Sequence, residues 1–430
     1  MGAAPTHRPD GRPRVVVTGF GVVSPAGRDA ASTFDAVLAG RSAATPIATW
    51  DPEGHPVRFA AQVTGLDPAP TIDPREARRM DRVSQLGIVA AQEALEQAGL
   101  AGDGDPGATD RTRVAVVIGS GVGGILTLED QIEVRVTRGV TRVGPLLIPM
   151  MMANATAGLV ALRHGFRGAA FSVATACASG VDSIGQALDM IRAGRADVVV
   201  AGGAEAAITP TAMAAFARMG ALSTRNDDPA GASRPFDRER DGFVMGEGAG
   251  VVVLESAAHA AQRGATVLGE LAGYGSTCDA HHITAPDPDA AGAIASMHQA
   301  LADAGLTPAA IAHVNAHGTS TPLNDAAESL AMEKVFGDDG PPVTSTKGVT
   351  GHLIGATGAV EAILALQSAR AGTVPMVANL HAPDVPGAVD LVLGGSRTIA
   401  VARPSPTRSG SAGTTHRWCW CPSMPERPRR

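Results

Sequence analysis

One cysteine of the chain lies in a setting suited to a nucleophile. Cys177 lies in the segment SVATACASGVDSIGQAL, between an apolar stretch and the start of an expected helix. The positive end of a helix dipole favours the thiolate form of a cysteine, and the small neighbours Ala176, Ala178 and Ser179 leave space for a substrate. The same pattern also suits a small buried cysteine in a core, so this segment alone leaves both interpretations open.

Two histidines favour the catalytic interpretation. His317 lies in NAHGTSTPLND and His352 in TSTKGVTGHLIGATGA, and each follows a strand-like stretch. A single histidine in such a position is more often structural than catalytic. However, Cys177, His317 and His352 follow three different expected strands, and sheets of parallel strands place their sites at the carboxyl ends. We therefore predict that the three side chains meet in one site.

The elements that would position these residues follow an alternating pattern. Buried strands are expected at 14–19, 113–120, 197–203 and 249–255, and helices at 82–98 and 178–194. The second helix is indicated by an apolar face and by a glycine that ends it, Val181, Ile184, Leu188, Ile191 and Gly194. Continuous Val and Ile strands that alternate with helices predict a mainly parallel sheet covered on both faces.

From about residue 266 the pattern repeats. GELAGYGS is similar to the opening VVVTGFGV, AHVNAHG and PVTSTKG read as strands that run into loops, and 356–369 reads as an apolar helix. A weak internal duplication is therefore plausible.

Composition narrows the class of protein. The 430 residues include 44% apolar but only 3% aromatic side chains, which predicts a core of tightly packed small residues. The formal net charge of −7 argues against nucleic acid as the main partner. No apolar run approaches the ~20 residues of a membrane helix, so no membrane association is expected.

Four cysteines in a chain of this length fit a reducing, cytoplasmic setting rather than a disulfide scaffold. Cys419 and Cys421 form C-W-C without a second ligand pair, so no zinc site is expected. Gly2 and Thr6 match a short myristoylation pattern that often occurs by chance, and we interpret residues 1–13 as a disordered polar leader.

A glycine-rich segment at 119–124, GSGVGG, satisfies the dinucleotide pattern G-x-G-x-x-G. It lies far from the first strand, and a charged stretch follows it rather than a second strand ending in an acidic residue. TGFGVVS at 18–24 is better placed but lacks the last glycine. We interpret both as tight turns at strand ends.

The segments TACASG, HGTSTPLND and KGVTGHLIGATGA together resemble the three active-site motifs of β-ketoacyl-acyl-carrier-protein synthases. The blocks at 234–250 and 279–288 also resemble that family, and the likeness runs from Arg14 to Ala402. It is closest to the synthase II branch of fatty-acid elongation and to the catalytic ketosynthases of type II polyketide systems. The resemblance implies an α/β, thiolase-like fold of two duplicated halves, 14–265 and 266–402, in five αβαβα layers.

The resemblance also implies a mechanism, a decarboxylative Claisen condensation. Cys177 would carry the acyl chain, and His317 and His352 would donate hydrogen bonds from Nε2 to the enolate formed when malonyl carrier loses CO2. Lys347 would support the histidines. No metal or redox cofactor is implied, since the substrates arrive on the phosphopantetheine arm of acyl carrier protein.

Further residues are assigned by the resemblance alone. Five would bind substrate: Thr319 and Thr321 on the phosphopantetheine arm, Thr284 beside them, Phe243 at the malonyl pocket and Val122 at the acyl tunnel. Asp325 and Glu328 would hold loops and balance charge.

The expected partners are an acidic acyl carrier protein and a second ketosynthase-like chain. Docking is expected at a group of arginines, Arg75, Arg78, Arg79, Arg82 and Arg142, although these could also be a solvated helix face. The second chain would complete a homodimer, or a heterodimer with a chain-length-factor-like subunit. Such a non-catalytic subunit typically lacks the nucleophile, so Cys177 argues against that role for this chain.

The C-terminus departs from the family, which ends in a motif like NSFGFGGHN. Residues 403–430 lack it and hold two of the three tryptophans and two of the four cysteines. Read one base out of frame from Pro404, the codons allow VANSFGFGGHNTSVVLV. We therefore interpret 403–430 as a frameshifted, disordered tail that impairs activity, with a genuine divergent tail as the alternative.

Overall fold

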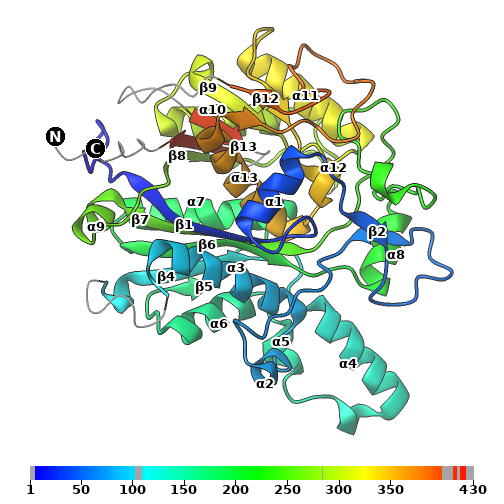
Figure 1. Ribbon diagram of the computed structural model, residues 1–430. Helices are drawn as coiled ribbons and strands as arrows, with labels where there is room; N and C mark the ends of the chain where they lie inside the picture. The colour runs from blue at the N-terminus through cyan, green and yellow to red at the C-terminus, as the bar shows by residue number, and fades with distance from the viewer. Residues whose placement is uncertain (1–4, 102–108, 283, 400–409, 414–416, 423–430) are drawn as a thin grey trace.

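The computed structural model in Figure 1 describes residues 5–101, 109–282, 284–399, 410–413 and 417–422, the last two ranges by their backbone only. A single sheet of ten strands runs through it in the order β10-β9-β13-β14-β8-β1-β7-β6-β4-β5. Two short two-stranded sheets, β2–β3 and β11–β12, lie outside it.

The ten strands are two copies of one five-stranded pattern. The first copy has the spatial order β5-β4-β6-β7-β1 and the second β10-β9-β13-β14-β8, and the strands correspond in chain order. Their bounds are β1 Val15–Val23, β4 Val114–Gly119, β5 Ala170–Phe171, β6 Val198–Glu205 and β7 Gly248–Ser256, then β8 Gly269–Gly275, β9 Ile311–Asn315, β10 Val343–Thr344, β13 Gly410–Gly413 and β14 Arg417–Pro422. The expected internal duplication is therefore visible in the topology.

Strand direction repeats in the two copies as well. Counted along the chain, the second strand of each copy (β4 and β9) runs parallel to both of its neighbours. The fifth strand of each copy (β7 and β14) is antiparallel to both of its neighbours. The copies meet where β1 pairs with β8, at Val15↔Leu271. The prediction of a mainly parallel sheet is wrong, because uninterrupted Val and Ile runs report burial on both faces and not strand direction.

Helices cover both faces and also fill the space between the two copies (Figure 1). α3 (Arg82–Ala98) and α6 (Ala155–His164) pack on the outer face of the first copy. α7 (Ser179–Arg192) and α13 (Thr357–Ala371) contact each other and lie between the copies, and α10 (Ala291–Ala304) and α11 (Pro322–Phe336) pack on the second copy. This is the five-layered αβαβα arrangement expected from the sequence.

Small residues allow these layers to approach closely. α3 begins where the Asp81 side chain accepts the N–H of Val83, and it ends at Gly99 in the left-handed conformation. A Cβ at Gly19 of β1 would lie 2.0 Å from the carbonyl oxygen of Ala94 on α3. The core predicted from the low aromatic content is thus realised by backbone-to-backbone packing.

The remaining elements lie mostly around the site and the periphery: α1 Ala30–Leu38, β2 Ala44–Pro46, β3 Phe59–Ala61, α2 Pro74–Ala77, α4 Ile125–Arg138, α5 Leu147–Met151, α8 Pro210–Arg218, α9 Ala257–Gln262, α12 Lys347–Thr350, β11 Thr373–Val374 and β12 Arg397–Thr398. Within the described ranges, none of the helices combines the length and the apolar character needed to cross a membrane.

The N-terminal leader differs from its expectation. Arg8 donates from Nη1 to the carbonyl oxygen of Ala272 (2.7 Å), and Arg12 pairs through Nη1 with Asp303 Oδ1 (2.5 Å). Disorder is therefore the wrong expectation for residues 5–13, because Arg8 and Arg12 also donate to the carbonyl oxygens of Asp303 and Ala304 at the end of α10. Gly2 lies outside the described residues.

The C-terminal tail differs as well. β13 pairs in parallel with β9, and β14 pairs antiparallel with β8, so the second copy extends to Pro422 rather than ending at residue 402. The expectation that the tail forms no strand is wrong for these two segments. Backbone N–H and C=O groups can pair whatever the side chains are. Without β13 and β14, the facing edges of β9 and β8 would have unpaired N–H and C=O groups, which these two segments bind. The other residues of 403–430 lie outside the described part.

Candidate active site

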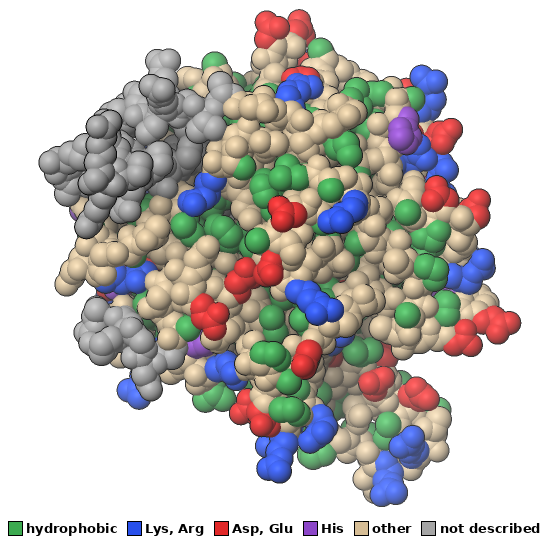
Figure 2. All heavy atoms as spheres, in the orientation of Figure 1, with side chains coloured by type: hydrophobic (Ala, Val, Ile, Leu, Met, Phe, Trp, Pro, Cys, Tyr) green, Lys and Arg blue, Asp and Glu red, His purple; other side chains and the backbone are tan. Residues whose placement is uncertain are grey.

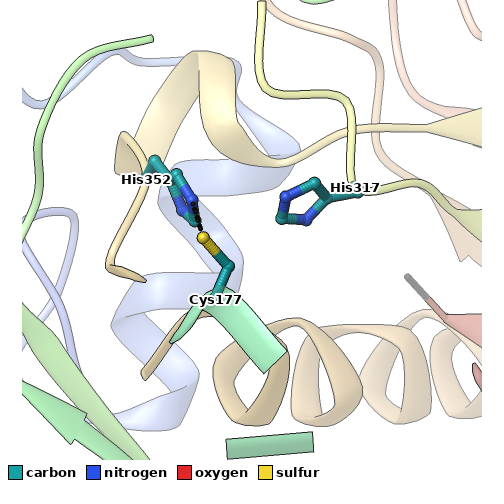
Figure 3. A group of neighbouring side chains, drawn as sticks. All are labelled: Cys177, His317 and His352. Carbon is teal, nitrogen blue, oxygen red and sulfur yellow. Dashed lines mark hydrogen bonds between the residues drawn. The ribbon is translucent and has the colours of Figure 1, made fainter. Parts of the chain in front are cut away.

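Cys177, His317 and His352 converge, as the sequence predicts (Figure 3). The Cys177 sulfur and one ring nitrogen of each histidine lie within 4.8 Å of one another. His352 Nε2 is 2.9 Å from Cys177 Sγ, and the two imidazole rings stand nearly perpendicular, 5.2 Å apart between centroids. The three side chains come from different loops: the short 3₁₀ turn Ala176–Ala178 before α7, the loop after β9, and the loop between α12 and α13.

The thiol of Cys177 is not held as a thiolate. Although the side chain keeps some exposed surface, the protein packed around it raises the pKa of Cys177 to about 11, with Lys347 acting in the opposite direction. Desolvation by the surrounding protein thus opposes the thiolate that the start of α7 is expected to favour. A base is needed to activate the sulfur.

His352 is suited to be that base. The ring is buried, and burial together with the nearby Lys347 ammonium holds the pKa of His352 well below its usual range. Nδ1 lies 2.9 Å from the hydroxyl of Thr357, the first residue of α13. Phe243 packs edge-on against the ring with centroids 5.1 Å apart. The backbone N–H of His352 donates to the carbonyl oxygen of Val244 (2.8 Å). The imidazole is therefore neutral and fixed in orientation.

His317 is oriented from its backbone and from its ring. Glu328 accepts the N–H groups of His317 (2.6 Å) and Gly318 (2.7 Å). The ammonium of Lys347 lies 3.4 Å from His317 Nδ1 and donates also to the His317 carbonyl oxygen. Because an ammonium can only donate, Nδ1 is the acceptor and the proton of the neutral ring is on Nε2.

Lys347 is a fully buried cation. Its Nζ lies 2.5 Å from Glu361 Oε1 on α13, and both side chains are at most 2% exposed. Burial raises the pKa of Glu361 to about 7, while Lys347 lowers it. Cysteine and histidine are also zinc ligands, but a buried ammonium behind His317 opposes a second cation there and favours the catalytic interpretation.

Several residues assigned by resemblance lie next to this group. The hydroxyls of Thr319 and Thr321 are 2.9 Å apart in the loop that begins at His317. Asp325 accepts the N–H of Phe236 (2.8 Å), and burial raises the pKa of Asp325 to about 6. Asp325 thus holds the 234–250 block, whose residues 243–246 support His352.

Other assigned residues are not brought into contact with the three central side chains. Val122 is 49% exposed in the loop after β4, and Thr284 is exposed, with its N–H donating to His282 Nδ1 (3.1 Å). Arg82 differs from the other arginines, because Glu247 binds its Nε (2.8 Å) and Nη2 (2.7 Å). The exposed members of the expected docking group are Arg75, Arg78, Arg79 and Arg142.

Three functional neighbours escaped the sequence analysis: Thr357, Glu361 and Glu205. Glu205 ends β6, is fully buried, and accepts from Ser120 Oγ (2.9 Å) and the N–H groups of Gly121 (2.7 Å) and Gly355 (3.1 Å). It therefore ties the loop after β4 to the loop after His352. Burial raises the pKa of Glu205 to about 7. The acidic end of an otherwise apolar strand was the available signal.

Two family models cover most of the chain. The "Beta-ketoacyl synthase, N-terminal domain" matches residues 12–260, and the "Beta-ketoacyl synthase, C-terminal domain" matches residues 268–381. The chain belongs to the β-ketoacyl synthase family. The split between the two matched domains falls just before β8, where the second copy of the strand pattern begins.

Curated relatives and solved structures agree with this family. The chain is 42% identical to 3-oxoacyl-[acyl-carrier-protein] synthase 2 of Synechocystis sp., over 90% of this chain and 93% of that protein. It is 44% identical to the protein of the same name from Vibrio cholerae, over 88% and 91%. A crystal structure of a β-ketoacyl synthase from Burkholderia phymatum superposes with a TM-score of 0.87 at 35% identity, covering 96% of this chain and all of the other. The fold is therefore the thiolase-like fold of the ketosynthases.

Ketosynthases with partner proteins are also represented among the solved structures. The ishigamide ketosynthase/chain length factor gives a TM-score of 0.86 at 33% identity. A type II polyketide synthase acyl carrier protein in complex with its ketosynthase, bound to the hexaketide, gives 0.85 at 29%. Each match covers 96% of this chain and 100% of the other.

Proposed function

We propose that the protein joins an acyl thioester to a malonyl unit as a 3-oxoacyl-[acyl-carrier-protein] synthase in fatty-acid elongation, with Cys177 as the acylated nucleophile. The observation that carries the proposal is the 2.9 Å contact between Cys177 Sγ and His352 Nε2 beside a second oriented imidazole, that of His317. The relatives named synthase 2 are 41–44% identical, more than the ishigamide ketosynthase/chain length factor at 33% and the type II polyketide ketosynthase at 29%, and this difference supports elongation over the polyketide alternative.

In the first half-reaction, Cys177 takes over the acyl chain. His352 Nε2 accepts the thiol proton as Sγ bonds to the acyl carbonyl carbon. The bond from that carbon to the carrier sulfur then breaks, and the proton passes to the leaving carrier thiolate. The raised pKa of Cys177 and the lowered pKa of His352 give a resting pair of thiol and neutral imidazole, so the proton moves as the Sγ–C bond forms and not before it.

In the second half-reaction, malonyl carrier loses CO2. The electron pair of the broken C–C bond forms an enolate, whose oxygen receives hydrogen bonds from Nε2 of His317 and His352. The enolate carbon attacks the acyl carbonyl carbon, the bond from that carbon to Cys177 Sγ breaks, and the resulting thiolate takes up one proton from water. His352 Nε2 must accept a proton in the first half-reaction and donate a hydrogen bond in the second. The Thr357 hydroxyl fits both states, because it can donate to His352 Nδ1 or accept from it.

This chemistry needs no metal or redox cofactor, because decarboxylation itself supplies the carbanion. We assign the phosphopantetheine arm to the hydroxyls of Thr319 and Thr321, which lie 2.9 Å apart in the loop that begins at His317. Phe243, which packs against the ring of His352, is proposed to line the pocket for the malonyl group. Val122 and Thr284 remain proposals for the acyl tunnel and the arm. A cytoplasmic location follows from the use of carrier-bound substrates.

The partners proposed are an acidic acyl carrier protein and a second ketosynthase-fold chain. Basic side chains gather over α2 and the tip of α4 at the lower end of Figure 2, where exposed arginines Arg75, Arg78, Arg79 and Arg142 are available. Arg82 is omitted because Glu247 neutralises it. The edge strand β5 and the exposed apolar side chains of α4 and α5 suit a homodimer, or a heterodimer with a chain length factor like the ishigamide ketosynthase/chain length factor.

Condensation in vitro tests the function. The purified chain, an acyl carrier thioester and malonyl carrier should give 3-oxoacyl carrier by mass spectrometry and one CO2 per product. The Cys177→Ala variant should give no condensation. Formation of 3-oxoacyl carrier at an equal rate by that variant would contradict the proposal.

A further inference from the structure

The backbone immediately before Cys177 is held in a conformation that it would not adopt unaided. Ala176 has a φ of 52°, in the left-handed region that residues with a Cβ rarely occupy. Such a conformation persists only where the surrounding structure over-determines it. Whatever restrains Ala176 therefore also sets where the sulfur of Cys177 points.

The restraints come from the first turns of α7. The Thr175 N–H donates to Ser179 Oγ (3.0 Å), and Ser179 Oγ donates to the carbonyl oxygen of Ala176 (2.7 Å). The Thr175 hydroxyl donates to Asp182 Oδ2 at 2.6 Å. The last bond has a charged acceptor and is the strongest of the three.

Asp182 is itself held by the single tyrosine of the chain. The Tyr274 hydroxyl donates to Asp182 Oδ1, so each carboxylate oxygen has a hydroxyl donor. Asp182 is only 6% exposed, and burial together with this carboxylate raises the pKa of Tyr274, which keeps it a donor. The tyrosine ring lies over Gly185 of α7, where a Cβ would come within 2.5 Å of it.

Tyr274 belongs to the other half of the molecule. It lies on β8, and its N–H donates to Asp303 Oδ2 (3.0 Å), the oxygen that also accepts from Arg192 Nη1 (2.7 Å) at the end of α7. The second half thus holds α7 at both ends, through Asp182 and Arg192. A displacement of β8 would therefore shift Asp182 and, through Thr175, the loop that carries Cys177.

We propose that Asp182, held by Tyr274, is a positioning residue that acts through Thr175 to keep Cys177 Sγ against His352 Nε2. The inference rests on the proposed role of Cys177 as the nucleophile. Asp182, Tyr274 and Thr175 act on the position of Cys177 and not by contact with the substrate. A misplacement of the sulfur by about 1 Å would slow acyl transfer by about a hundredfold and would leave malonyl decarboxylation at the histidines nearly unchanged.

The test compares Thr175→Val with Thr175→Ser, because valine keeps the shape and loses the donor, whereas serine keeps the donor. We expect Thr175→Val to load acyl chains on Cys177 about tenfold to a hundredfold more slowly, and Thr175→Ser to stay within about threefold of the native rate. Tyr274→Phe, which retains the ring over Gly185, should fall between them. Thr112→Val is the matched control, because the exposed Thr112 hydroxyl also donates to a carboxylate, that of Asp110 (2.7 Å).

Malonyl decarboxylation without an acyl donor and the melting temperature are measured on the same variants. A native loading rate in Thr175→Val would overturn the positioning role. So would an equal loss of loading and decarboxylation, because that result indicates general damage rather than a displaced sulfur. If Cys177 of the native chain takes up no acyl group, the proposed function fails instead, and the two failures are distinguished.

Discussion

The ammonium of Lys347 lies 3.4 Å from Nδ1 of His317 and 2.5 Å from Oε1 of Glu361, with no exposed surface of its own. It therefore has two tasks: it sets the tautomer of His317, and it balances a buried carboxylate. These tasks can be separated by mutation.

Lys347→Met should lower malonyl decarboxylation about a hundredfold, because His317 loses the group that keeps its proton on Nε2. The same change leaves Glu361 buried without its cation and should destabilise the fold by about 3–5 kcal/mol. Adding Glu361→Gln should restore most of the stability in urea unfolding but not the decarboxylation. Recovery of both in the double variant would show that Lys347 is only structural.

The two histidines should affect the half-reactions differently. His317→Ala should reduce decarboxylation about 10²–10³-fold and acyl loading by less than about tenfold. His352→Ala should reduce both, since His352 also accepts the thiol proton. Radiolabelled CO2 release and acyl-enzyme formation measure the two steps separately. A variant of His317 that decarboxylates normally but fails to load would reverse the assigned roles.

The protonation state of Cys177 predicts a pH profile. Its pKa is raised to about 11 and that of His352 is lowered, so the resting pair is a thiol and a neutral imidazole. The thiolate fraction then grows about tenfold per pH unit between pH 7 and 9, and alkylation of Cys177 by iodoacetamide should accelerate accordingly. Peptide mapping separates Cys177 from the exposed Cys278. A rate that is constant from pH 6 to 9 would indicate a preformed thiolate–imidazolium pair.

Elements with a strong local pattern could be predicted from the sequence. The helix expected at 82–98 is α3 with the same bounds, because its apolar face, Asp81 and Gly99 are all local signals. The convergence of Cys177 with the histidines was also predictable, since each follows a strand end.

Features that depend on distant partners could not be predicted. Glu205 and Asp182 gain their roles from partners far along the chain: Ser120 and Gly355 for Glu205, and Tyr274 for Asp182. The net direction of the Cys177 pKa shift depends on how much protein surrounds the sulfur, which a helix-start motif does not report. The pairing of β13 and β14 depends on a vacant slot in the sheet rather than on strand-forming side chains.

The strands of the C-terminal tail pair less regularly than the corresponding strands of the first copy. In the first copy, β6 and β7 pair without interruption from Val198↔Glu255 to Glu205↔Gly248. Among the described residues, the corresponding β13 and β14 pair from Ser411↔Trp420 to Gly413↔Trp418, and both strands have register shifts against their outer neighbours, β9 and β8. A version that reads VANSFGFGGHNTSVVLV from position 404 should therefore melt at a higher temperature and condense faster. Equal stability and activity of the two versions would refute the frameshift interpretation.

Direct identification of the acylated residue tests the central claim. The native chain is incubated with an acyl-carrier thioester in the absence of malonyl carrier, and its peptides are mapped by mass spectrometry. We predict one acyl group per chain, on the peptide that contains Cys177, and none in the Cys177→Ala variant. Acylation of Cys278 instead, or an acylated Cys177→Ala variant, would contradict the account.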